Sequence, residues 1–480
     1  MAKIAFLMMG ALASAAVTAA VSNPRFVPAG NPCFVGRDDV VLGKFYLDSD
    51  CQRKQDTVEV DLTGTKSGDL KSIFFGRTKG TIAGDKAIFR VPVVKGECFY
   101  TVYAEPAAKP DILSRKIVIQ GVPVRVGSLV TRPNQEILDV GRKSKNFRIP
   151  GVAVTPKGTL VAVFDNRFHH SGDLPADITV GVSTSKDGGN TWSPIRTALG
   201  VAGIPGGHGI GDPCVLVDPS NGRIWVAAMR APNSGHPIWA SEKGTIDPKR
   251  CAQFILAYSD DEGQTWSAPI NITENVKRLG DPDTADWGVV FQGPGAGIAL
   301  ADGTLIFPAQ VWGHRGKAPH HSLLVYSTDH GKTWTSSKEN PYGGSESVAV
   351  QLPDGSVLLN TREGQGPASR VTARTTDLGQ TWEKVETTPL RQPNNLCQAA
   401  MLAMGDNLYF SNPDSAARDT MTLRRSSDGG KTWPKKVVYD KRPCAGYSSL
   451  VPLGSDAVGV LYEGASDYHY FLRIPLEELE

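Results

Sequence analysis

Several arginines and acids of this sequence stand beside strongly apolar segments, where packing alone would not call for charge. They are Arg148, Arg167, Asp173, Asp212, Arg230, Glu346, Arg362, Arg418 and Glu463, with Tyr447 among them. Arginine presents a planar, permanently charged pair of donors that fits a carboxylate or a phosphate, and acids beside such a group can move protons. The net charge is only +2, so an anionic ligand would be bound by these local arginines rather than by a field of the whole protein.

Six hairpins of one design must position these residues. Each consists of an apolar strand, a turn with a glycine and a second, strongly apolar strand; the turn glycines are Gly158, Gly222, Gly303, Gly355, Gly405 and Gly454. Residues roughly seven to ten positions from such a turn lie at the open end of the hairpin, ~25–30 Å away. If the hairpins are arranged radially, their open ends meet on one face. Arg418 and Asp173 fall in loops that leave second strands, so they emerge on that face too.

A second repeat consists of short motifs that are typical of tight turns between strands. The pattern S/T-x-D-x-G-x-T-W occurs five times, at Ser185–Trp192, Ser259–Trp266, Ser327–Trp334, Thr375–Trp382 and Ser426–Trp433. Its hydroxyl and carboxylate can bind backbone amides in a tight turn, its glycine suits a left-handed position and its tryptophan can pack between strands. These boxes are therefore structural, despite their acid.

The two repeats together predict an all-β protein whose main part is a six-bladed β-propeller over residues 136–480, one blade lacking the box. Residues 23–135 lack the repeat but hold further strand patterns, at Thr57–Leu62, Ala87–Val94 and Cys98–Ala104. No helical stripe is present. We expect a small β-sandwich there.

The first residues are typical of a secretory signal. Lys3 is followed by an apolar run from Ile4 to Val17 and then by small residues that suit cleavage after Ala20. The run is short for a membrane span. We therefore expect a signal peptide over 1–20 and a secreted or periplasmic protein, with association with the cell surface as an alternative and no membrane insertion.

The cysteines and histidines offer no metal site. Cys33, Cys51 and Cys98 are close enough in sequence to form a disulfide, and buried thiols are an equal alternative. The cysteine spacing matches no zinc site, and His169 and His170 are expected at the rim of the site. We predict no metal and no cofactor, and the balanced charge gives no reason to expect a nucleic acid partner.

The segment Phe147-Arg148-Ile149-Pro150 resembles the FRIP motif of bacterial and animal exo-sialidases, a family that also carries these aspartate boxes. The resemblance covers the whole propeller, and the preceding sandwich resembles the accessory domain of some bacterial members. It implies an exo-α-sialidase (neuraminidase), a glycoside hydrolase that removes terminal sialic acid (N-acetylneuraminic acid) from glycoproteins, glycolipids and oligosaccharides. The implied partners are sialylated glycans such as mucins, glycoproteins and gangliosides.

The resemblance also implies roles for single residues. Arg148, Arg362 and Arg418 match the triad that holds the sialic acid carboxylate, although Arg424 and Arg425 lie close to the third position. Asp173 matches the acid/base, with Asp177 and Asp165 as competitors. Glu346 and Tyr447 match the nucleophile pair, and Glu463 matches the carboxylate that orients Arg148. Arg167 and Asp212 are further candidates for contact with the 4-hydroxyl of the sugar, or they support the residues that make this contact. Gln292 and Trp239 are candidates for the acyl or glycerol pocket. For Trp239 the alternative is a packing role at the surface or in the core.

The chemistry explains these residue types. A carboxylate nucleophile would be repelled by the substrate's own carboxylate, whereas a tyrosine deprotonated by Glu346 as it attacks is not; sialidases are a recognised exception of this kind. Two displacements predict retention of configuration. The alternatives are a trans-sialidase, an anhydro-forming variant and, as a protein without catalysis, a glycan-binding propeller.

Overall fold

The computed structural model describes residues 22–50, 52–200, 209–317, 320–362, 370–464 and 467–480. The predicted signal peptide and Cys51 lie outside these ranges. The described chain is almost entirely β, as expected. Its α-helix is the single turn α1 (Thr273–Lys277), and short 3-10 helices lie at Ile112–Ser114, Ile238–Ala240, Pro282–Thr284, His314–Gly316 and Leu476–Leu479.

The N-terminal unit is a sandwich of two antiparallel sheets. One sheet has the order β1 (Ser22–Pro28), β3 (Val41–Ser49), β9 (Gly96–Pro106), β5 (Leu70–Phe75), β6 (Thr78–Lys79), and the other has the order β4 (Arg53–Asp61), β8 (Lys86–Val93), β7 (Thr81–Ala83). Alternating residues of the two sheets face each other, and the rings of Phe75 and Phe89 stack across the interface with centroids 3.9 Å apart. The predicted sandwich is confirmed.

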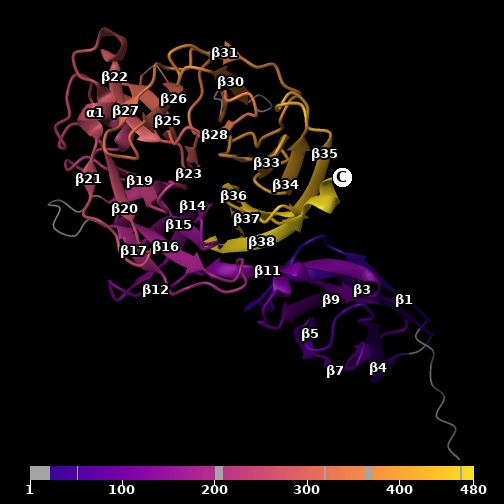
Figure 1. The fold of residues 1–480 in the computed structure, drawn as a ribbon. Coiled ribbons are helices and arrows are strands. Elements are labelled where there is room, and N and C mark those ends of the chain that lie inside the picture. Colours follow the sequence, from indigo (N-terminus) through magenta and orange to yellow (C-terminus); the bar gives the residue numbers. More distant parts are fainter. Residues whose placement is uncertain (1–21, 51, 201–208, 318–319, 363–369, 465–466) are drawn as a thin grey trace, which may run out of the picture.

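Six sheets form the propeller ring (Figure 1). The first four blades run β14 (Asn146–Val154), β15 (Leu160–Arg167), β16 (Ile178–Ser185), β17 (Arg196–Leu199); β18 (Ile210–Val217), β19 (Ile224–Arg230), β20 (Gln253–Ser259), β21 (Ile270–Asn271); β22 (Trp287–Gln292), β25 (Leu305–Gly313), β26 (His320–Ser327), β27 (Thr335–Ser336); and β28 (Ser347–Gln351), β29 (Val357–Thr361), β30 (Val371–Thr375), β31 (Glu383–Lys384). The fifth is β32 (Ala400–Met404), β33 (Asn407–Pro413), β34 (Met421–Ser426), β35 (Lys435–Asp440), and the sixth begins with β36 (Ser448–Leu453), β37 (Ala457–Glu463), β38 (His469–Pro475).

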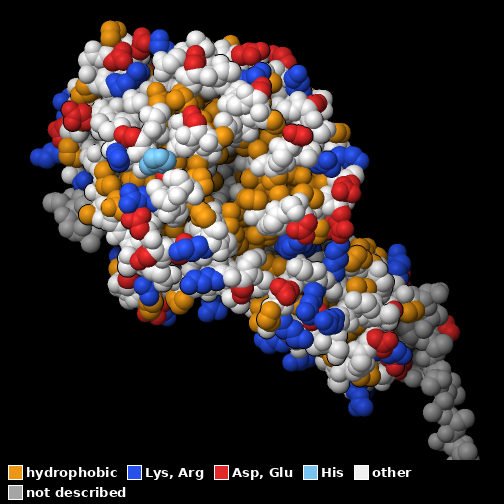
Figure 2. All heavy atoms as spheres, in the orientation of Figure 1, with side chains coloured by type: hydrophobic (Ala, Val, Ile, Leu, Met, Phe, Trp, Pro, Cys, Tyr) orange, Lys and Arg blue, Asp and Glu red, His pale blue; other side chains and the backbone are white. Residues whose placement is uncertain are grey.

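Short strands complete the sheets. β23 (Gly295–Ala296) pairs with β18 of the second blade, and β24 (Ile298–Ala299) pairs with β25. The hairpin of β12 (Gln135–Ile137) and β13 (Arg142–Ser144) precedes the first blade. All six predicted turn glycines have positive φ, between 57° and 89°. Figure 2 shows the middle of the ring as a hollow around which hydrophobic side chains gather.

The aspartate boxes join the third strand of a blade to its fourth. In the first box the Ser185 hydroxyl accepts a hydrogen bond from the Gly189 amide at 2.9 Å, while the Asp187 carboxylate binds the Thr191 amide at 2.9 Å and the Thr191 hydroxyl at 2.6 Å. The other four boxes repeat these contacts. The predicted structural role is confirmed.

The sixth blade explains why there are five boxes for six blades. Its outer strand is β11 (Val122–Thr131), which precedes the propeller in sequence, pairs antiparallel with β38 and continues to β10 (Lys116–Ile119). No third-to-fourth turn is needed there. β2 (Cys33–Phe34) also pairs with β11. The predicted boundary at residue 135 is therefore wrong for this strand: β11 lies within the range predicted for the sandwich, but it is part of the last blade and closes the ring.

The six described cysteines are all free thiols, so the disulfide alternative has no support within those residues. Burial raises the pKa of the Cys33 thiol to about 12. Among the described helices, none is long and apolar enough to cross a bilayer.

Closure by β11 can be tested at Gly127. A Cβ there would lie 2.6 Å from Leu472 of β38 and 2.7 Å from Phe34 of β2, closer than packed atoms allow. Gly127→Val should lower the free energy of unfolding in urea by about 1–3 kcal/mol. As a control, Gly121→Asn should change it by less than about 0.5 kcal/mol, because Gly121 has φ 73° and open space around it and asparagine tolerates that conformation. Equal stability of the two variants would contradict this closure.

Candidate active site

A cavity of about 1590 Å³ opens where the hairpin ends converge. Its lining includes eight of the predicted site residues: Arg148, Asp173, Asp212, Trp239, Glu346, Arg362, Arg418 and Tyr447. Glu463, Arg167 and Gln292 lie behind this lining, where they bind residues that form it. The structure therefore brings together the eleven residues to which a role was assigned, in two layers. Gln292, expected to line the acyl or glycerol pocket, is instead fully buried behind it.

Two hairpins place a pair of candidate site residues at the same position. Glu346 and Arg362 lie one residue beyond the last ladder pair of β28 and β29, and the Arg362 amide donates to the Glu346 carbonyl at 2.7 Å. Tyr447 and Glu463 stand opposite each other at the open end of β36 and β37, where the Glu463 amide donates to the Tyr447 carbonyl at 2.9 Å. Each pair is thus fixed by backbone hydrogen bonds.

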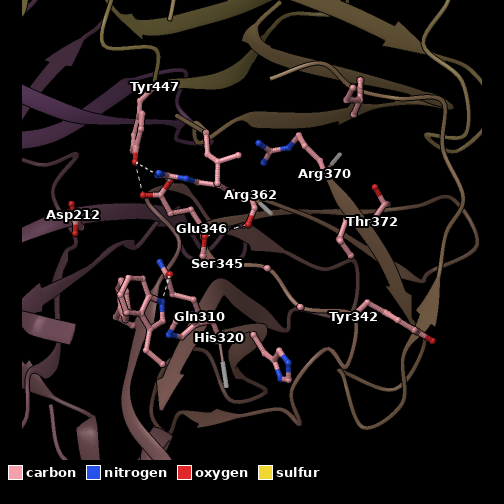
Figure 3. A pocket seen from close by; sticks show the side chains of 18 of the residues that line it. Asp212, Gln310, His320, Tyr342, Ser345, Glu346, Arg362, Arg370, Thr372 and Tyr447 are labelled. Atoms are coloured by element: carbon pink, nitrogen blue, oxygen red, sulfur yellow. Dashed lines mark hydrogen bonds and ion pairs between the residues drawn. The ribbon is translucent and has the colours of Figure 1, made fainter. Parts of the chain in front are cut away.

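The three groups Tyr447, Glu346 and Arg362 contact each other on the floor of the cavity (Figure 3). The Tyr447 hydroxyl donates to one Glu346 carboxylate oxygen. Arg362 Nη1 binds the other carboxylate oxygen at 2.8 Å and the Tyr447 oxygen at 3.0 Å. Burial raises the pKa of Tyr447 well above 10, and the charge of Glu346 adds to this, while Arg362 opposes it. The phenol is therefore neutral at neutral pH and has a carboxylate beside it to take its proton.

Arg148 is oriented by Glu463. Its Nε donates to Glu463 Oε1 at 2.6 Å, and the same carboxylate accepts from the Ile149 amide and the Tyr447 amide, both at 2.9 Å. Burial works to raise the pKa of Glu463, but the charge of Arg148 and the hydrogen bonds from Arg148 and Ile149 outweigh it and lower the pKa below 4.5. Glu463 is thus a buried anion that holds the first arginine.

The backbone around Arg148 is irregular in a way that aims the side chain. The register of β14 shifts between Arg148 and Gly151, and Ile149 has φ 63°, which is costly for a β-branched residue. The second blade repeats the device, since β18 shifts between Gly211 and Cys214 and Asp212 has φ 57°. Bulges of this kind redirect side chains at functional sites.

Arg418 is held by two carbonyls instead of an acid. Its Nη1 donates to Ala445 at 2.8 Å and its Nη2 to Leu396 at 2.7 Å, while Nε is buried without a partner among the described residues. Arg418 and Arg148 lie 5.6 Å and 5.5 Å from the centroid of the Tyr447 ring. The competitors for this position do not line the cavity, since Arg424 pairs with Asp414 and Arg425 binds Asn407.

Asp173 extends into the cavity on a loop after β15. Its side chain is 80% exposed and accepts a hydrogen bond from Arg167 Nη1 at 2.8 Å. Of its competitors, Asp165 is fully buried beneath Arg167, and Asp177 pairs with Arg142 outside the lining. Asp173 is therefore the acid of the three that a substrate can reach.

A buried network supports Asp173 and Asp212. Arg167 binds Asp165 Oδ2 through Nη2 at 2.9 Å, and Asp165 Oδ1 accepts from the Asp212 amide at 2.9 Å. Burial raises the pKa of Asp165 to about 6 despite Arg167. Burial and then the charge of Asp165 raise the pKa of Asp212 well above 3.8. Gln292, fully buried, donates to the Asp212 carbonyl and so supports it from behind.

Trp239 lies in the wall of the cavity, on the 3-10 helix Ile238–Ala240, with half of its surface exposed. Several lining residues were not predicted: Gln310, Trp312, His320, His321, Tyr342 and Arg370. Trp312 Nε1 donates to Gln310 at 2.9 Å. Gln310 lies seven residues after the turn glycine Gly303, so the rule that located the other residues would have found it had uncharged side chains been considered.

The Glu463 contact predicts a pH dependence of stability. Because the folded pKa of Glu463 is lowered, its contribution is present above the unfolded pKa near 4.5 and is lost as the pH falls through the folded value. Glu463→Gln should cost about 3–5 kcal/mol at neutral pH, measured by urea unfolding, and less below that window. Glu386→Gln, at an exposed pair with Lys384, should cost less than about 1 kcal/mol. A wild-type advantage that persists undiminished into strong acid would refute the assignment.

The chain is similar to known proteins over most of its length. The model of the BNR repeat-like domain family matches residues 158–462. The chain is 37% identical to a sialidase of Bacteroides fragilis over 352 residues, 70% of this chain and 63% of the relative, and 31% identical to a sialidase of Micromonospora viridifaciens over 399 residues, 79% of this chain and 60% of the relative. It thus spans less than two thirds of each relative's length. The solved Hadza microbial sialidase Hz136 superposes with a TM-score of 0.81 at 29% identity, covering 95% of this chain and 100% of that one. The chain therefore belongs to the BNR repeat-like domain family, and it is similar to bacterial sialidases over most of its length.

Proposed function

We propose that this protein is an exo-α-sialidase that hydrolyses terminal sialic acid from glycans and retains the anomeric configuration. The observation that carries the proposal is the contact of the Tyr447 hydroxyl with Glu346 and Arg362, in a cavity that Arg148 and Arg418 also line. A neutral nucleophile among arginines suits a substrate with a carboxylate on its reacting carbon. The sialidases among its relatives support the same activity.

In the first displacement, Arg148, Arg362 and Arg418 bind the substrate carboxylate. The phenolic oxygen of Tyr447 attacks the anomeric carbon while its proton passes to Glu346. Asp173, exposed in the cavity, protonates the departing glycosidic oxygen. The bond to the leaving sugar breaks as the bond to Tyr447 forms.

In the second displacement, Asp173 takes a proton from water, which attacks the anomeric carbon. Glu346 returns its proton to the Tyr447 oxygen as that bond breaks. Two inversions at one carbon give net retention. Asp212 and Arg167 would support the 4-hydroxyl side of the sugar, the first by contact and the second through Asp173 and Asp165.

The substrate classes and the location belong to the proposal. We infer that the substrates are sialylated mucins, other glycoproteins and gangliosides, which present the anionic sugar at a free end. The lysine and apolar run near residue 1 support export to the periplasm or the medium. Transfer to a second sugar, or formation of an anhydro product, remains the alternative that Trp239 favours, because a half-exposed aromatic ring in the wall could stack on an acceptor.

The nucleophile is tested by Tyr447→Phe. The variant keeps the ring and loses the attacking oxygen, so release of a fluorogenic aryl group from its sialoside should fall at least about 10³-fold, with the fold intact by circular dichroism. Asn395→Ala, outside the lining, serves as a control with wild-type activity. A wild type that releases nothing across pH 4–9 would sink the sialidase proposal, and an active Tyr447→Phe would sink the nucleophile.

The acid is tested by leaving-group dependence. Asp173→Asn cannot protonate the departing oxygen, so cleavage of sialyllactose should fall about 10²–10⁴-fold. An aryl sialoside, whose leaving group needs little protonation, should show a much smaller loss in the first displacement, measured as the pre-steady-state burst. Equal losses on the two substrates would show that Asp173 is not the acid. Product analysis by NMR of the same reactions separates hydrolysis from transfer.

A further inference from the structure

Arg370 is a buried guanidinium that the proposed mechanism does not use. It is 8% exposed, lines the cavity and precedes β30. Its hydrogen bonds go to neutral oxygens: Nε to Asn360 Oδ1 at 2.6 Å, Nη1 to the Cys397 carbonyl at 2.8 Å and to Gln392 Oε1 at 3.3 Å. Nη2 is buried without a partner among the described residues.

The absence of an acid partner is unusual for a buried arginine. Arg148, Arg167 and Arg442 each form an ion pair with an aspartate or glutamate. Within the described residues Arg370 forms none, a property it shares with Arg418. Burying an unpaired charge is costly, so the charge is expected to serve the site. Burial lowers the pKa of Arg370 to about 10, with Arg362 adding to the effect, and the group is still a cation at neutral pH.

The contacts of Arg370 link two arms of the arginine triad. Asn360, its Nε partner, stands two residues before Arg362 on the end of β29. Cys397, its Nη1 partner, follows Leu396, whose carbonyl anchors Arg418. Cys397 also packs against Tyr447 in a small buried cluster. Figure 3 shows Arg370 beside Arg362, on the side away from Asp212.

We propose that Arg370 is a positioning residue of this site: it braces Arg362 and Arg418, and its unpaired charge acts on the Glu346–Tyr447 pair. The inference rests on the proposed function. Several charged and titratable groups surround Glu346 and Tyr447. They are Arg148, Asp173, Asp212, Arg362, Arg370, Cys397, Arg418 and Glu463. Arg370 differs from the other cations in that set because it is set back in the wall and need not touch the substrate.

Two variants test the charge separately from the brace. Asn360→Asp keeps the oxygen that accepts from Nε but places a carboxylate on the guanidinium, which neutralises it with little change of shape. Arg370→Met removes charge and hydrogen bonds together. Both should move the acidic limb of the kcat/KM profile to higher pH by about half a unit or more, because the anionic site then loses a neighbouring positive charge. Arg370→Met should also lower kcat at least tenfold. Arg370→Lys keeps the positive charge but loses the planar set of guanidinium donors. It should leave the acidic limb near its wild-type position.

The matched control is Arg424→Met. Arg424 is as buried as Arg370, and it pairs with Asp414. When Arg424 is replaced, Asp414 still pairs with Lys436. The acidic limb of the kcat/KM profile should therefore not move. An active wild type whose acidic limb is unchanged in folded Asn360→Asp would overturn the role of the charge. If Arg370→Met does not fold, the Asn360→Asp profile decides alone. A wild type without activity on sialosides would instead overturn the proposed function itself.

Discussion

The rest of the site depends on the hydrogen bonds that the Glu463 carboxylate accepts. The carboxylate stands on the last blade, binds Arg148 and the Ile149 amide of the first blade, and binds the Tyr447 amide at the end of its own hairpin. One buried anion thus holds Arg148, the strained backbone beside it and Tyr447 at fixed separations. A buried charge is tolerated only when it is paired and its lone pairs are satisfied, and all three contacts meet that requirement.

That interaction exists only if the ring is closed. The first and last blades meet because β11, from before the propeller, completes the sheet of β36–β38. The N-terminal unit is therefore connected to the propeller through the pairing of β2 with β11 as well as through the chain. Closure of the ring removes sheet edges and gives the inner strand ends fixed positions, which is what a site assembled from Arg148, Glu346 and Tyr447 on different blades needs.

The sequence predicts the ring, its blade number and most of the cavity, because turn chemistry and strand alternation are local. In the box at Ser185 and the turn at Gly158, the local residue types determine the backbone conformation. The role of 122–131 was not predictable in this way, because pairing between β11 and β38 joins residues about 340 positions apart and leaves no local pattern. Gln310 and Arg370 were missed for different reasons: the first is uncharged, and the second owes its place to the Asn360 and Cys397 contacts, which no spacing rule encodes.

The most direct test of this account is to trap the intermediate. Incubating the protein with a sialic acid that carries fluorine at carbon 2 and carbon 3 should slow the second displacement, and intact mass spectrometry should then show one sugar added. Peptide mapping should place it on Tyr447, and the adduct should disappear when the protein is left to turn over. A sugar found on Glu346 or Asp173, or full inactivation without any adduct, would contradict a tyrosine nucleophile among three arginines.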